Sequence, residues 1–175
     1  KVDYVDTVVG GIPAIVATPT EVPPVRHILY IHGGAYVVGS PRSHIAMCAR
    51  LAKRAAATIT VIDYRLAPEH AFSAAVEDAD FAFRWAQTRA EQLGADADRV
   101  AVAGDSAGGT LAAVVSRHAS ARRHDDPFAP APAAQLLVYP AIHANSDAPS
   151  RRAFATGVPP GAGGTPTGSW RPTCP

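Results

Sequence analysis

Short apolar runs separated by polar and glycine-rich stretches dominate the first 140 residues. Two extended runs, 4–9 and 12–17, flank Gly10-Gly11, and this spacing predicts a β-hairpin. The later runs are continuous and apolar, which is typical of strands buried on both faces. These runs cover residues 28–31, 59–62, 100–103 and 135–139.

Helical spacing fills the gaps between the later runs. Ser43 is a suitable N-cap for a helix with apolar positions from 45 to 55. Apolar residues recur in steps of three and four from Phe72 to Leu93, which predicts an amphipathic helix ending at Gly94. A third helix is expected to end near Arg123. Strands that alternate with helices indicate crossover connections, and therefore an α/β domain with a mostly parallel sheet.

Four residues that could belong to a functional site directly follow predicted strands. They are His32, Asp63, Ser106 and Pro140. Because sites in open α/β sheets lie at the carboxyl ends of the strands, we expect these residues to share one rim.

Composition narrows the class of protein. The 175 residues fit one domain, and 47% hydrophobic with 18% charged residues is typical of a soluble globular chain. A net charge of +1, with dispersed Lys and Arg, argues against a nucleic-acid surface. No apolar run approaches the ~20 residues of a membrane span, and the charged N-terminus is unlike a signal peptide.

The two cysteines form neither a disulfide framework nor a metal-binding pattern. Cys48 is expected to be buried on a helix and Cys174 to be a free thiol in a loose tail. We therefore predict a reducing, cytoplasmic location.

The end of the chain differs in character. Residues 157–175 contain five glycines and five prolines without helical or strand periodicity. This composition predicts a disordered tail after a domain at 1–156.

The segment Gly104-Asp105-Ser106-Ala107-Gly108-Gly109 carries the most informative chemistry. It joins an apolar strand to a helical stretch, so Ser106 is predicted at the apex of a sharp, strained turn. Glycines two residues to either side prevent clashes there. The turn would expose a nucleophilic hydroxyl and aim the N–H of Ala107 at an incoming carbonyl oxygen. For this pattern alone, a flexible glycine loop is the alternative.

A second glycine motif, Ile31-His32-Gly33-Gly34-Ala35-Tyr36, follows the strand at 28–31. Consecutive small residues allow backbone N–H groups to converge on one point. Acyl transfer needs such donors because its tetrahedral intermediate carries a negative oxygen. A tight glycine turn is the alternative when this motif is taken alone.

Together these motifs resemble the hormone-sensitive-lipase-like family of α/β-hydrolases, and the resemblance covers roughly residues 25–150. Further matching segments are Gly39-Ser40, Ser43-His44, the stretch from Asp63 to His70, the stretch from Ala74 to Asp78, and Val138-Tyr139-Pro140.

The resemblance implies an α/β-hydrolase fold and a serine esterase that cleaves small-molecule, short-chain acyl esters without cofactor or metal. Ser106 would be the nucleophile that becomes acylated. Ala107, Gly33 and Gly34 would supply the oxyanion-hole N–H groups. Ala35 stands where the family more often has a third glycine.

The resemblance also implies supporting roles around the rim. His32 would hold the oxyanion loop, and Asp63, Arg65 and Glu69 would form a buried polar network. Asp105 would direct its side chain away from the nucleophile, so it is not assigned as the triad acid.

The triad itself is incomplete in this sequence. A serine nucleophile needs a base, and the base needs an orienting carboxylate. In this fold both follow the serine, acid first, yet neither family segment is present. His118 and His124 are predicted on the helix behind the nucleophile. His143, with Asp147 four residues on, is a makeshift pair that we disfavour.

We expect a domain truncated at both ends, lacking its last strands and helices. Only 31 residues precede His32, too few for the hairpin and the family's helical cap, and the chain does not begin with Met. A reading-frame change near Gly157 is a hypothesis for the tail, which translation of the DNA in its other two frames would test. Loss of the last strands would leave the strand at 135–139 as an unprotected edge, so we expect marginal stability or aggregation of the chain.

Three functions stay open on the sequence alone. A carboxylesterase, or the recognisable part of one, is the leading hypothesis. A non-catalytic ligand-binding protein is the second, because plant hormone receptors of the same family keep the serine elbow and lack the histidine. An inactive fragment is the third.

Overall fold

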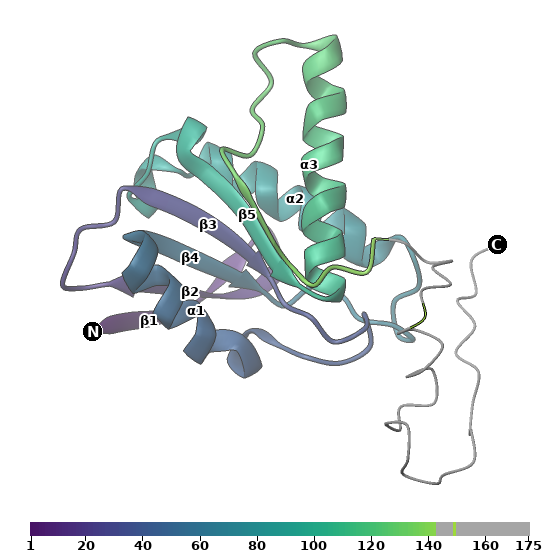
Figure 1. The fold of residues 1–175 in the computed structure, drawn as a ribbon, viewed down its shortest axis with the longest axis horizontal. Helices are drawn as coiled ribbons and strands as arrows, with labels where there is room; N and C mark the ends of the chain where they lie inside the picture. Colours follow the sequence, from purple (N-terminus) through teal and green to yellow (C-terminus); the bar gives the residue numbers. More distant parts are fainter. Residues whose placement is uncertain (143–148, 150–175) are drawn as a thin grey trace, which may run out of the picture. The chain divides into compact units, whose positions relative to one another are not determined.

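A six-stranded mixed sheet organises the computed structural model, which describes residues 1–142 and residue 149 (Figure 1). Its strands lie in the order β1-β2-β4-β3-β5-β6. Their bounds are β1 (Val2–Val9), β2 (Ile12–Pro19), β3 (Arg26–Ile31), β4 (Ala57–Ile62), β5 (Val100–Asp105) and β6 (Gln135–Val138). Every strand that the sequence predicts is present, extended by a few residues in most cases.

Strand register brings the carboxyl ends of the parallel strands together. The β1–β2 hairpin joins the sheet through an antiparallel pairing of β2 with β4. Parallel pairing then places Ile31 opposite both Ile62 and Gly104, and Asp105 opposite Val138. The segments that follow β3, β4, β5 and β6 therefore leave the sheet along one edge, as predicted.

Helices cover both faces of the sheet (Figure 1). Helix α1 (Pro41–Ala55) packs on one face, where Ile28 and Tyr30 meet Cys48. Helices α2 (Ala74–Thr88) and α3 (Ala107–Asp125) lie on the other, where Leu29 and Ile31 join the core. Successive side chains of β3 point to opposite faces of the sheet, so this strand contributes to two separate apolar layers. Two short 3₁₀ helices, Glu91–Leu93 and Ala97–Arg99, lead into β5.

The predicted N-cap of α1 is wrong by three residues. The helix begins at Pro41, and Ser40 is the N-cap. Ser43 instead completes a capping box, in which its hydroxyl accepts the Ser40 N–H at 3.0 Å. Proline is well suited to the first helical position because its fixed φ fits the helix and its missing N–H has no partner there anyway.

The predicted end of the second helix at Gly94 is wrong. Helix α2 ends at Thr88, and Gly94 instead terminates the 3₁₀ turn that follows, in a left-handed conformation with φ 78°. Cys48 is fully buried, and burial raises the pKa of its thiol to about 12, which makes it an unreactive cysteine.

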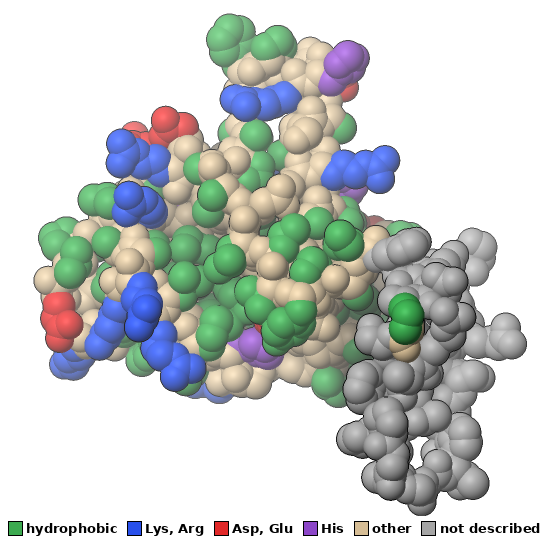
Figure 2. Space-filling model, in the orientation of Figure 1, with side chains coloured by type: hydrophobic (Ala, Val, Ile, Leu, Met, Phe, Trp, Pro, Cys, Tyr) green, Lys and Arg blue, Asp and Glu red, His purple; other side chains and the backbone are tan. Residues whose placement is uncertain are grey.

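In the sheet that the described residues form, β6 is an edge strand, as predicted, and β1 lies at the opposite edge. Its Leu136 is half exposed, and Figure 2 shows hydrophobic side chains open to solvent on the face in view. Among the described residues, no helix is both long and apolar enough to cross a bilayer. Lys1–Ala141 form one compact unit. The expected domain end at 156, the tail at 157–175 and Cys174 lie outside the described residues.

Two glycines allow α3 to pack against the sheet at van der Waals distance. A Cβ at Gly108 would lie 2.0 Å from the carbonyl oxygen of Ile31 and 2.6 Å from that of His32. A Cβ at Gly104 would lie 2.4 Å from the carbonyl carbon and oxygen of Gly108. These obstacles are backbone atoms, which cannot rotate away, so the start of α3 sits where it does only because both positions lack side chains.

We predict that Gly108→Ala lowers the free energy of unfolding by about 3 kcal/mol or more, the upper end of the range for overpacking. Gly109→Ala is the matched control on the same helix and should cost less, since its added methyl would lie 3.0 Å from the carbonyl oxygen of Gly104, against 2.0 Å from that of Ile31 for Gly108→Ala. Urea unfolding followed by circular dichroism measures both. Equal stabilities of the two variants would contradict the packing argument.

The buried side chain of His27 makes the stability of the fold depend on pH. Its side chain is fully buried on β3, and neither ring nitrogen has a hydrogen-bond partner among the described residues. Burial therefore lowers the pKa of His27 to about 4, against 6.5 when exposed. Below pH 6.5 the His27 side chain binds a proton in the unfolded chain, whereas in the folded chain it stays neutral down to about pH 4.

We predict that the free energy of unfolding falls as the pH drops from 6.5 to 4, with His27 contributing up to about 1.4 kcal/mol per pH unit. His27→Leu should reduce this slope by nearly one proton, whereas His124→Leu, at an exposed site, should leave it unchanged. The measurement is urea unfolding at a series of pH values. An unaltered slope in His27→Leu would refute the assignment.

Candidate active site

Ser106 occupies the turn between β5 and α3 in a conformation that few residues adopt. Its backbone has φ 50° and ψ −118°, and its N–H donates to the carbonyl oxygen of Val138 at 2.9 Å. Its side chain is half-buried at the carboxyl edge of the sheet. This is the strained strand–turn–helix apex that the sequence predicts.

Ala107 is the first residue of α3. The N–H groups in the first turn of a helix have no intrahelical acceptor, and the helix dipole makes that end attractive to negative charge. The N–H of Ala107 is therefore available to a ligand oxygen beside Ser106.

The loop after β3 makes a tight turn of unusual backbone conformation. Gly34, Ala35 and Tyr36 have φ of 128°, 54° and 66°. The N–H groups of Val37 and Val38 both donate to the carbonyl oxygen of Gly34 at 3.0 Å. Within residues 1–142, no hydrogen bond engages the N–H of Gly34 or Ala35. A Cβ on Gly34 would lie 1.8 Å from the carbonyl oxygen of Val38, so this turn requires glycine.

Asp105 connects this loop to the elbow. The N–H of Gly33 donates to Oδ1 of Asp105 at 3.0 Å, and the contact is so close that a Cβ on Gly33 would lie 2.2 Å from Oδ2. The N–H of Gly33 is thus already in use, unlike those of Gly34 and Ala35. The two glycine motifs, 72 residues apart in sequence, are held together by one carboxylate.

Two further side chains reach the same carboxylate oxygen. The buried hydroxyl of Tyr30 donates to Oδ1 of Asp105 at 2.7 Å. Nε2 of His44, on α1, lies 3.4 Å from Oδ1. Burial, followed by the hydrogen bond to Asp105, raises the pKa of Tyr30, so this phenol remains a proton donor.

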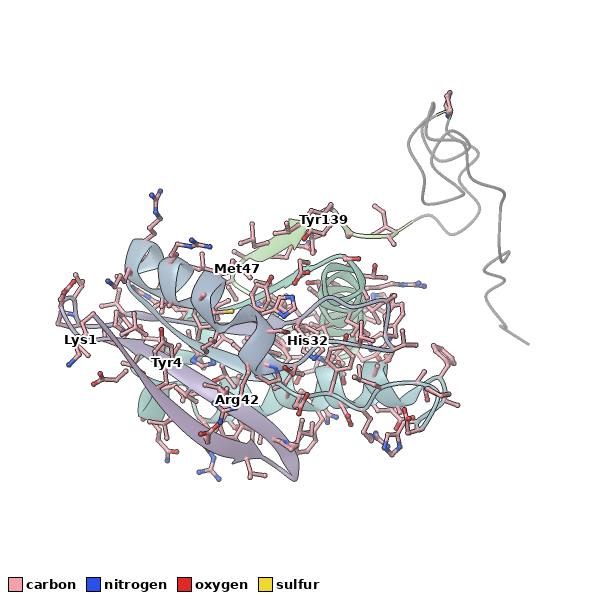
Figure 3. All side chains as sticks on the ribbon, turned by 90° about the horizontal axis from the view of Figure 1, so that it is seen from below. Lys1, Tyr4, His32, Arg42, Met47 and Tyr139 are labelled. Carbon is pink, nitrogen blue, oxygen red and sulfur yellow. The ribbon has the colours of Figure 1, made fainter. Side chains whose placement is uncertain are left out.

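His32 is fully buried beneath the loop, whereas Tyr139, after β6, is 74% exposed (Figure 3). Nδ1 of His32 lies 2.8 Å from the carbonyl oxygen of Gly33, which requires a proton on Nδ1. The ring stacks on Tyr64 with 4.4 Å between centroids, and the Tyr64 hydroxyl donates to the His32 carbonyl oxygen. Burial lowers the pKa of His32, which favours its neutral form.

The predicted network of Asp63, Arg65 and Glu69 is wrong. Arg65 pairs with Asp78 at 2.7 Å and with Glu77 at 3.2 Å, both on the first turns of α2. Glu69 is exposed. Asp63 is half-buried after β4, and its side chain has no hydrogen bond to a described residue. Adjacent carboxylates at a helix start offer Arg65 a better-placed pair of acceptors than its neighbours in sequence do.

No base is in place beside the nucleophile in the described part of the chain. No hydrogen bond joins the Ser106 hydroxyl to a histidine or carboxylate there. His118 lies on α3, 3.6 Å from Asp80 of α2, and His124 is exposed near the end of α3. His143 and Asp147 lie outside the described residues. Residues 1–142 contain no group of three or more side chains suited to a metal ion.

Sequence reasoning missed the aromatic and charged side chains that support the loop. Tyr30 could have been recognised, because it lies on the face of β3 that α1 covers and immediately precedes the motif that begins at Ile31. Asp78 lies in the stretch from Ala74 to Asp78 that matches the family, but no partner for it was predicted. His44 also stood in a matched segment, but its approach to Asp105 depends on how α1 packs, which no local pattern encodes.

Comparisons with known proteins place this geometry in a family. The family model for the α/β-hydrolase fold matches residues 28–160. An ethyl acetate hydrolase of Pseudomonas putida is 42% identical over 130 residues, which are 74% of this chain and 40% of that protein. The chain thus spans less than half the length of that curated relative.

Solved structures agree with the sequence relatives. An esterase of Pyrobaculum calidifontis superposes with a TM-score of 0.75 at 39% identity, covering 88% of this chain and 50% of that one. An esterase described as belonging to the bacterial hormone-sensitive lipase family superposes with a TM-score of 0.63 at 38% identity, covering 77% and 42%. The chain therefore belongs to the α/β-hydrolase-fold family, in the hormone-sensitive-lipase-like group of esterases.

Proposed function

We propose that this chain is a carboxylic ester hydrolase acting on short-chain acyl esters, with Ser106 as its nucleophile. The observation that carries the proposal is the pairing of the strained Ser106 apex with unengaged N–H groups on two sides, from Ala107 and from the loop at Gly34. The names of its relatives support an ester as the substrate class.

In the proposed reaction the Ser106 Oγ attacks the ester carbonyl carbon. The carbonyl oxygen becomes an oxyanion and accepts hydrogen bonds from backbone N–H groups. Collapse releases the alcohol and leaves an acyl-serine, which water then hydrolyses. Loss of a single oxyanion donor costs roughly 2.7–4 kcal/mol in a well-studied protease, so these N–H groups carry much of the rate.

The available donors sharpen the assignment of the oxyanion hole. Ala107 and Gly34 are proposed as donors, and Ala35 joins them because its N–H is also unengaged. The N–H of Gly33 is bound to Asp105, so Gly33 contributes by fixing the loop rather than by donating to substrate. We propose structural roles for His32 and Asp105, which bind the carbonyl oxygen and the N–H of Gly33.

The proton of Ser106 must pass to a base. The described residues place none within hydrogen-bond reach, so the proposal requires a base from outside residues 1–142. His143 with Asp147 is one pair in the remainder of the chain. In triad enzymes that lose a member, the oxyanion hole and substrate binding still supply roughly 10³–10⁴-fold acceleration over water.

We further propose that the chain works in the reducing cytoplasm. The buried free thiol of Cys48 supports this location. No cofactor enters the proposed reaction.

We predict that the chain hydrolyses p-nitrophenyl acetate with sustained turnover and that Ser106→Ala abolishes it. Ser116→Ala, on the same helix, is the matched control, because the Ser116 hydroxyl donates a hydrogen bond to the Ala112 carbonyl oxygen of its own helix. Release of p-nitrophenol followed by absorbance measures the rates. His143→Gln tests the remaining pair: full activity in that variant excludes His143 as the base. Turnover that survives in Ser106→Ala would contradict the proposal.

A ligand-binding protein without turnover is the second candidate, favoured by the missing base beside Ser106. It predicts saturable binding of a non-hydrolysable acetyl amide, measured by calorimetry, together with no p-nitrophenol release. Turnover that depends on Ser106 would exclude this candidate.

A further inference from the structure

His44 occupies a position that the proposed reaction leaves without a role. It lies on the first turns of α1, and its side chain is 21% exposed, although it reaches inward to the carboxylate beside the nucleophile. Its ring is 5.5 Å from that of His32 and 6.3 Å from that of Tyr30, measured between centroids. The three aromatic rings therefore contact Asp105 or Gly33.

The surroundings of the His44 ring fix its orientation. Nδ1 lies 2.9 Å from the Ser43 hydroxyl oxygen and 3.3 Å from the Ser40 carbonyl oxygen. Both serines belong to the capping box that begins α1. With Nδ1 held at the helix start, Nε2 points to Oδ1 of Asp105. The helix cap therefore directs this imidazole, and the imidazole faces the carboxylate.

Among the described residues, the polar contacts of the Asp105 carboxylate meet at its Oδ1 atom. Tyr30 donates at 2.7 Å, Gly33 donates at 3.0 Å, and Nε2 of His44 lies at 3.4 Å, a contact longer than an ordinary hydrogen bond. Tyr30 approaches from β3 and His44 from α1, so together they limit the rotation of the carboxylate. The carboxylate in turn sets where the N–H of Gly33, and hence the next two N–H groups, can lie.

We infer that His44 is a positioning residue for the oxyanion loop, acting through Asp105 on Gly33. This inference rests on the proposed function. The bound ester carries no oxyanion; the negative charge develops in the transition state that leads to the tetrahedral intermediate, so a displaced loop lowers kcat and leaves KM nearly unchanged. A residue that merely stabilised the fold would instead alter the fraction of active protein without moving the Gly33 amide.

The test uses the full chain carrying His44→Leu and His44→Gln, with His70→Leu at an exposed site as the control. The first readout is the ¹H chemical shift of the Gly33 amide, which lies downfield when it is bonded to a carboxylate. We expect an upfield shift in His44→Leu and restoration towards the native value in His44→Gln, whose amide keeps a polar group facing Asp105. His70→Leu should retain the native shift.

The second readout is turnover of p-nitrophenyl acetate. We expect kcat to fall about tenfold in His44→Leu at unchanged KM, less than the 10²–10³ that removal of a donor costs, and to recover in His44→Gln. If His44→Leu does not fold, His44→Asn replaces it, because its shorter amide keeps the site polar without reaching Asp105.

The two readouts separate this inference from the proposed function. An amide shift in a chain with no turnover supports the role of His44 while contradicting the esterase. A folded His44→Leu variant with an unmoved Gly33 amide overturns the inference, whatever its turnover.

Discussion

One carboxylate oxygen links the two halves of the candidate site. Oδ1 of Asp105 binds the N–H of Gly33, and Asp105 directly precedes Ser106. The bond therefore joins the loop after β3 to the turn after β5 and fixes the distance between their unengaged N–H groups. Without it, the hydroxyl and the N–H groups would belong to two independent loops, and no common oxyanion position would exist.

The fold sustains this bond at some conformational cost. Ser106, Ala35 and Tyr36 all occupy the left-handed half of backbone space, which disfavours residues with side chains. Packing on both sides over-determines these conformations. Gly108 and Gly104 bring α3 against β3 and β5, while His32, stacked on Tyr64, holds the carbonyl oxygen of Gly33 from below. Strain at the site is thus offset by the close contact of elements remote in sequence.

Much of this arrangement is readable from local patterns. Continuous apolar runs located the strands, and the glycine spacing around Ser106 located the turn, because both are imposed by sterics within a few residues. The start of α1 and the partners of Arg65 were predicted wrongly, since Ser40 and Ser43 both suit a cap and Arg65 has nearby carboxylates in sequence. The contacts of His44 and Tyr30 with Asp105 were not predicted, because they depend on the packing between α1, β3 and β5. The engaged state of the Gly33 N–H was likewise invisible until the loops were placed together.

The direct test of this account is a crystal structure of the chain after reaction of Ser106 with a p-nitrophenyl alkylphosphonate. A phosphonyl oxygen models the oxyanion of the tetrahedral intermediate. We predict that this oxygen lies 2.7–3.1 Å from the N–H groups of Ala107 and Gly34, the distance expected for oxyanion donors, while Gly33 remains bound to Asp105. A phosphonyl oxygen directed to solvent, or a Ser106 that fails to react, would contradict the central claim that one carboxylate assembles a working oxyanion hole.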